Sequence, residues 1–165
     1  MHRCLIVLPA LLAAPLAGCV VGVTSGEPYK EALRGSYTNF TRVDVSAGVE
    51  AVVSQGPFDV KGEIKRGDNF DKLIVEVKGD TLHISRQMQM FGGNGPEYRV
   101  TVAAPAYREF EVSSGASLDG SNLVLQDVDV TVSSGASAEL SGTCSRLDVD
   151  VSSGARFDGE GLRCG

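Results

Sequence analysis

One short phrase occurs three times in the C-terminal third of the chain. It reads VSSGASLDG from Val112, VSSGASAELSG from Val132 and VSSGARFDG from Val151, so successive copies begin 20 and 19 residues apart. The residues that precede each copy alternate apolar and polar positions, as along a strand with one buried face. A unit of about 20 residues cannot bury an apolar face alone, so neighbouring copies must stack and share a core.

The repeats therefore predict an all-β chain that forms a β-helix or β-solenoid, with rungs of about 20 residues that lie about 4.8 Å apart. Residues 41–56, 58–64 and 97–105 also alternate, and residues 72–85 read as two strands joined at Gly79-Asp80, so we expect antiparallel strand pairs before the stack. Apolar spacing of helical period is missing and the chain has 20 glycines, which favours sheet.

The glycine of each phrase marks a corner between strands. Gly115, Gly135 and Gly154 occupy this place. We expect a positive φ there, which costs glycine nothing and costs a β-branched residue on the order of 1–3 kcal/mol. The segment VSAG at 45–48 has the same form and reads as an earlier copy.

The N-terminus has the layout of a secretory signal. Arg3 precedes an apolar run from Leu5 to Leu16, which is too short to span a membrane. Residues 16–19, LAGC, resemble a bacterial lipobox, in which cleavage before the cysteine is coupled to attachment of diacylglycerol to its sulfur. Ordinary secretion with a cysteine near the cut is the alternative.

These features predict a signal peptide over residues 1–18, a lipidated tether over 19–37 and one folded domain over 38–165. Acyl chains on Cys19 would anchor the domain at a membrane surface, since each buried methylene contributes roughly 0.8 kcal/mol. Val20, rather than an aspartate, follows the cysteine. By analogy with bacterial sorting, this favours the outer membrane.

The charge of the chain argues against nucleic acid as a partner. Loss of residues 1–18 removes Arg3 and leaves 14 basic against 21 acidic residues, with no basic stripe. Binding to phosphates needs clustered Lys and Arg. Aromatic residues make up 6% of the chain and Trp is absent, so we expect a thin, aliphatic core.

Two cysteines remain after Cys4 and Cys19 are accounted for. Cys144 and Cys164 both fall in the place that Leu125 has one repeat earlier. Stacked positions about 4.8 Å apart lie within the Cα range of a disulfide, so we expect a bridge, with two buried thiols as the alternative. Two cysteines without companion histidines do not make a zinc site, and we expect no metal or cofactor.

Acidic residues align on the outward positions of the repeats. Glu109, Asp129 and Asp148 form one column, and Glu111 and Asp150 flank Thr131 in the next. The five acidic residues form a candidate binding face. A cation or a basic partner is one interpretation. A solvated face is the other, because two like charges 4.8 Å apart in water repel by only about 0.9 kcal/mol.

Nucleophilic catalysis has little support in the sequence. His83 is the only histidine left after the signal, and it lies on an alternating strand, so no residue is assigned a catalytic role. Cleavage of glycans by a carboxylate pair such as Asp129 and Asp148 is the enzymatic alternative. The shortage of aromatic side chains that stack on sugars weighs against it.

The strand pair and the repeats together resemble a known family. GDNFDKLIVEVKGDTLHIS, followed by YRVTVAAPAYREFEVSSGASLDG and two further SSGA repeats, is similar to the head GIN domain family, which is described as auto-transporter adhesin heads. The resemblance covers about residues 40–165. It implies a secreted or surface-attached bacterial domain of right-handed β-helical character, with no established enzymatic activity.

We therefore expect a non-enzymatic, lipid-anchored binding module of the cell envelope, similar to an adhesin. Its expected partners are the membrane, through the lipid, and an unknown protein or glycan. Two alternatives are a structural envelope protein that self-associates into homo-oligomers through its last rung, and a β-helical enzyme that acts on glycans.

Overall fold

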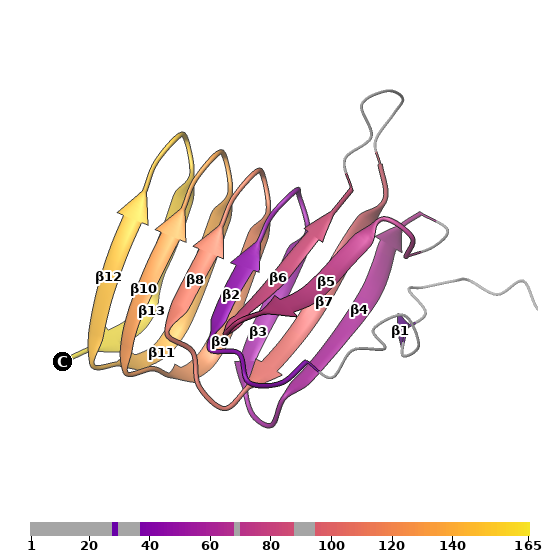
Figure 1. The fold of residues 1–165 in the computed structure, drawn as a ribbon. Helices are drawn as coiled ribbons and strands as arrows, with labels where there is room; N and C mark the ends of the chain where they lie inside the picture. Colours follow the sequence, from indigo (N-terminus) through magenta and orange to yellow (C-terminus); the bar gives the residue numbers. More distant parts are fainter. Residues whose placement is uncertain (1–27, 30–36, 68–69, 88–94) are drawn as a thin grey trace, which may run out of the picture.

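The chain folds into two β-sheets. The computed structural model describes residues 28–29, 37–67, 70–87 and 95–165, and within these ranges all regular structure is strand (Figure 1). The strands are β1 (Pro28–Tyr29), β2 (Arg42–Val45), β3 (Glu50–Gln55), β4 (Asp59–Arg66), β5 (Leu73–Lys78), β6 (Thr81–Arg86), β7 (Glu97–Ala104), β8 (Glu109–Val112), β9 (Ser117–Val124), β10 (Asp127–Val132), β11 (Ser137–Cys144), β12 (Arg146–Val151) and β13 (Arg156–Cys164).

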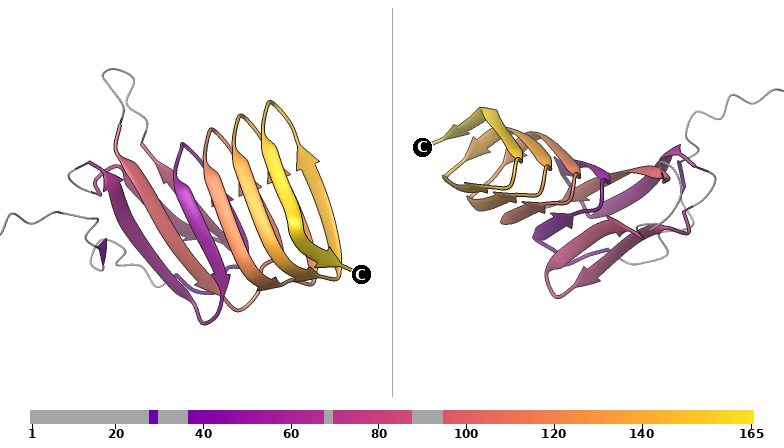
Figure 2. Two further views of the ribbon diagram at one scale, coloured as in Figure 1. Left: turned by 180° about the vertical axis from the view of Figure 1, so that it is seen from behind. Right: turned by 90° about the horizontal axis from the view of Figure 1, so that it is seen from above.

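Each repeat contributes one strand to each sheet. Sheet A has the order β1-β4-β7-β3-β9-β11-β13 and sheet B the order β12-β10-β8-β2-β6-β5. Along the C-terminal half the chain crosses from sheet B to sheet A at every SSGA phrase and then returns to start the next repeat, so that β12 and β13 end the two rows (Figures 1 and 2).

Equivalent residues of successive repeats are lateral neighbours. Strands β8, β10 and β12 pair in parallel, and Val132 is the register partner of both Val112 and Val151. On the other sheet β9, β11 and β13 also pair in parallel. The repeat length of about 20 residues is therefore the length of chain needed to cross both sheets and return.

The early part of the chain follows the expectation only in part. β5 and β6 form the antiparallel pair joined at Gly79-Asp80, and β4 pairs antiparallel with β7. The segments β2 and β3, however, lie inside the stack rather than ahead of it. Val45 of β2 pairs in parallel with both Ile84 and Val112, because the VSAG segment offers the same strand and corner as the later repeats.

The core is formed by the side chains that point from the two sheets toward each other. Burial alternates along the strands, as in β7 and β10, and the buried residues among those described are all apolar. The largest side chains of this core are Tyr98, Tyr107, Phe40, Phe110, Leu82, Ile84, Leu118, Leu123 and Leu140. The buried Tyr107 hydroxyl donates to the Ser54 carbonyl oxygen at 2.8 Å, which satisfies its polar end.

After the SSGA phrase a leucine is followed two positions later by a glycine, in Leu118 to Gly120 and again in Leu140 to Gly142, but these two leucines are not register partners. Ala138 is the neighbour of Leu118, and Leu140 is the neighbour of Gly120. A Cβ added at Gly120 would lie 2.7 Å from Leu140 Cδ2 and 2.9 Å from Val53 Cγ2. Large and small residues alternate from repeat to repeat at this position, so that the Leu140 side chain fills the space that Gly120 leaves.

The predicted signal peptide, Cys19 and nearly all of the predicted tether lie outside the described residues. Among the residues that are described, none forms a helix that could cross a bilayer.

Candidate functional site

The corners of the stack are tight turns with two residues at positive φ. Gly115, Gly135 and Gly154 have φ of 70°, 71° and 73°. The serine before each glycine is also left-handed, with φ of 52° to 53° at Ser114, Ser134 and Ser153. Two consecutive positive φ angles are the signature of a type I′ turn, in which glycine suits the second position.

Backbone hydrogen bonds close each turn and join it to the next. Ala136 N donates to Ser133 O at 3.1 Å within one turn, and Gly135 N donates to Ser153 O at 3.1 Å in the neighbouring turn. The VSAG segment has the same form, with φ of 57° at Ala47 and 70° at Gly48. The serine at positive φ is a feature that the sequence analysis missed, although a dipeptide that ends in glycine is a recognised signal for this turn.

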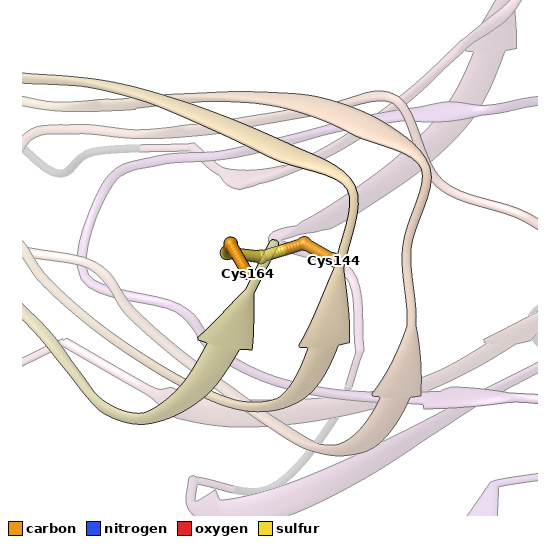
Figure 3. The surroundings of a disulfide bond; sticks show 2 residues. All are labelled: Cys144 and Cys164. Carbon is orange, nitrogen blue, oxygen red and sulfur yellow. A yellow bond between two sulfur atoms is a disulfide. The ribbon is translucent and has the colours of Figure 1, made fainter.

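A disulfide joins the last two strands of sheet A. Cys144 and Cys164 are register partners with Cα atoms 4.4 Å apart, and their sulfur atoms are bonded (Figure 3). Cys144 is buried, as is Leu125 in the preceding repeat. The bridge therefore ties the C-terminal strand to the stack at the slot that the spacing indicated.

The acidic residues predicted from the repeats lie in two rows across sheet B. Asp129 is the register partner of Glu109 and of Asp148, and Thr131 is the partner of Glu111 and of Asp150. Four of the acidic residues in these rows are exposed, namely Glu111, Asp129, Asp148 and Asp150. The rows thus form one carboxylate-bearing outer face, which we call the acidic face.

Basic groups limit the acidic face on the side of β2 and β6. Arg42 continues the first row, and its Nη1 lies 3.2 Å from Glu109 Oε2. In the second row Asp44 lies next to Glu111, and His83 Nδ1 lies 2.8 Å from Asp44 Oδ2. The carboxylates of β10 and β12 are consequently the part of the face farthest from Arg42 and His83.

The environment of Glu111 disfavours its charged form. Loss of part of its hydration beside the neighbouring strands raises the pKa of this carboxyl, and the nearby charges of Asp44 and Glu109 raise it further, while His83 acts in the opposite direction. Glu111, which protonation or a cationic neighbour would stabilise, thus lies in the middle of the acidic face. The face is therefore suited to a positively charged partner.

A second acidic row lies on the opposite sheet and was missed by the sequence analysis. Glu139 is the register partner of Asp119 and of Asp158. Together with Ser137 and Arg156 they line an open groove of about 330 Å³ on sheet A. The sequence conceals this row, because matching the two leucine-to-glycine patterns sets Ser141 rather than Glu139 beside Asp119.

These surfaces can offer hydrogen-bond acceptors and negative charge, but they do not assemble a metal centre. No group of three or more His, Cys, Asp or Glu side chains within the described part of the chain is arranged to hold a metal ion. Asp129 and Asp148 lie exposed on sheet B, whereas the groove lies on sheet A. A carboxylate pair enclosed in a cleft is what glycan cleavage requires, and this pair does not lie in the groove.

A family model described as "Putative auto-transporter adhesin, head GIN domain" matches residues 39–165. The chain belongs to the head GIN domain family. This match covers the strand pair, the VSAG segment and all three SSGA repeats. A search of curated protein sequences finds no match.

Solved structures that share the fold of this head GIN domain include two with TM-scores above 0.5. One is described as a "putative adhesin" from Parabacteroides distasonis, at 18% identity and a TM-score of 0.60, with 73% of this chain and 52% of that chain covered. The other is described as a "putative adhesin" from Bacteroides fragilis, at 15% identity and a TM-score of 0.56, with 84% and 72% covered. The chain thus spans about half the length of the first.

Proposed function

We propose that this head GIN domain is a non-enzymatic binding module, similar to an adhesin, which is anchored in the bacterial cell envelope by lipid on Cys19. The strands form the coils of a right-handed β-helix, and the protein resides at the outer membrane. The observation that carries the binding role is the acidic face, in which a rigid parallel sheet holds carboxylates in fixed rows.

A rigid sheet is suited to recognition because its side chains need little ordering on binding. Asp129, Asp148 and Asp150 lie one or two strands beyond Glu109 and Glu111 on the same outer face as Arg42, so they remain available to a basic protein surface. Attraction between opposite charges accelerates such an encounter and makes it sensitive to salt.

The binding role is tested by capture from envelope extracts. The full chain is compared with an Asp129→Asn/Asp148→Asn/Asp150→Asn variant, and a species that binds the first and not the second supports the proposal. An Asp59→Asn/Glu63→Gln/Glu76→Gln variant removes the same charge elsewhere and should retain the partner. Equal capture by all three proteins would remove the acidic face from the account.

The anchor is tested separately by fractionation of cells. Cys19→Ser should move the protein from the membrane fraction to the soluble fraction, because an acyl anchor contributes most of the membrane affinity. Retention of the variant in membranes would show that another segment holds the protein there.

A further inference from the structure

The segment that precedes the domain contacts it at one end of the stack. Pro28 and Tyr29 form β1, which pairs antiparallel with β4 at the edge of sheet A. Tyr37 lies against β5 at the edge of sheet B, where its hydroxyl donates to the Val75 carbonyl oxygen at 3.2 Å. Both contacts lie at the end of the stack opposite β12 and β13 (Figure 1). We call this end, formed by β1, β4 and β5, the tether end.

The charge of the domain changes along the stack. Residues 109–165, which contain β8 to β13, carry ten acidic and three basic side chains, whereas the described residues between 37 and 108 carry eight and nine. At the tether end, Lys61 of β4 and Lys78 of β5 each form an ion pair with the acidic residue two positions earlier on the same strand. The tether end is therefore close to neutral, and the later repeats are strongly negative.

Both outer faces of the later repeats carry this negative charge. Sheet B has the acidic face, and sheet A has the row of Asp119, Glu139 and Asp158. A membrane that contains anionic lipid repels such a surface within a Debye length, which is about 8 Å at physiological ionic strength. If either sheet lay flat on the membrane, one of these carboxylate rows would meet the headgroups. Charge therefore favours a domain that stands on one end of the stack.

The length of the tether selects which end that is. Pro28 follows Cys19 by nine residues, which reach at most about 30 Å when fully extended. The six steps from β1 to β13 across sheet A span about 29 Å at about 4.8 Å each. A domain that stood on β13 would need a fully extended tether and would press the acidic repeats against the headgroups. A domain that stands on the tether end needs neither.

We propose that the tether end faces the anionic phospholipid headgroups of the membrane that holds the protein, and that charge repulsion keeps the later repeats away from them. This inference rests on the proposed lipid at Cys19. It gives the domain one orientation, in which β12 lies five strand steps, about 24 Å, farther from the headgroups than β5. The acidic face is thereby open to a partner that is not itself part of that membrane.

The test measures energy transfer to the membrane from two sites on sheet A. The full chain, purified with its lipid, carries one donor dye on an azide-bearing residue that replaces either Lys61 on β4 or Arg156 on β13. The two sites are matched, because each side chain is an exposed cation in an ion pair within its own strand. The vesicles contain phosphatidylethanolamine, phosphatidylglycerol and an acceptor dye on the headgroups. Transfer from position 61 should be at least about twofold higher than from position 156, since the sites are about 24 Å apart along the stack.

The two triple variants that test binding also test the role of charge. The triple variant of the acidic face should bring the two transfer efficiencies closer together, whereas the charge-matched triple variant of β4 and β5 should not. Equal transfer from the two positions, higher transfer from position 156, or an unchanged ratio in the acidic-face variant would each overturn the proposal. A protein that does not associate with the vesicles and transfers from neither position would instead disprove the anchor, and the orientation would fail with it.

Discussion

The corner glycines provide the sharpest test of how the repeats shape the chain. At Gly135 φ is 71°, and a Cβ added there meets no heavy atom within 4 Å. Substitution therefore introduces backbone strain without a steric clash. For a β-branched residue at positive φ the strain is toward the upper part of about 1–3 kcal/mol, whereas asparagine tolerates this conformation.

We expect Gly135→Val to lower the melting temperature by about 5–10 °C and Gly135→Asn to lower it by less than half as much. The assay is thermal unfolding followed by circular dichroism with the disulfide intact. Ser134→Asn makes the Asn-Gly pair that type I′ turns prefer, so it should raise the melting temperature. Equal melting of Gly135→Val and Gly135→Asn, or destabilisation by Ser134→Asn, would refute the assignment of the turn.

Three further perturbations follow from single sites. The raised pKa of Glu111 means that stability is lost as pH rises from the ordinary carboxyl range through the pKa of this group in the folded state. Glu111→Gln should therefore stabilise the protein at neutral pH and have no such effect in acid. An equal change of unfolding free energy at both pH values would contradict this. Replacing Cys144 and Cys164 by serine opens a link with a sequence separation of 20 residues, which should cost about 3 kcal/mol in urea unfolding; an unchanged midpoint would show that the bridge is dispensable. Gly142→Ala should cost more than any corner substitution, because its Cβ would lie 2.8 Å from the backbone carbonyl carbon of Leu123, and normal expression and melting would disprove that close approach.

Much of the architecture could be predicted because it depends on local patterns. The two-residue alternation, the repeat length and the recurring glycine predicted all-β structure, the parallel partners of Val132 and the disulfide slot. Each of these features follows from the length of one repeat or from the backbone geometry of one corner.

The remaining features depend on contacts between repeats, which one sequence does not display. The VSAG phrase marks β2 as a copy of the repeat, but the place of β2 between β6 and β8 depends on long-range pairing that the phrase does not specify. The pairing of Leu140 with Gly120 depends on the space beside Gly120, which is shared by the three neighbouring strands β3, β9 and β11. The groove lined by Asp119 and Asp158 was missed for the same reason.

The most direct test of the central claim, that successive repeats pair in parallel and in register, is a pair of engineered cysteines. Thr131 and Asp150 are register partners on adjacent strands with outward side chains, so Thr131→Cys/Asp150→Cys should form a disulfide under mild oxidation, as detected by mass spectrometry of peptides. The matched pair Thr131→Cys/Asp148→Cys is offset by two residues, which places its Cα atoms about 8 Å apart, beyond the range of a disulfide, and it should stay reduced. Bridging of the offset pair in preference to the register pair would contradict the stack.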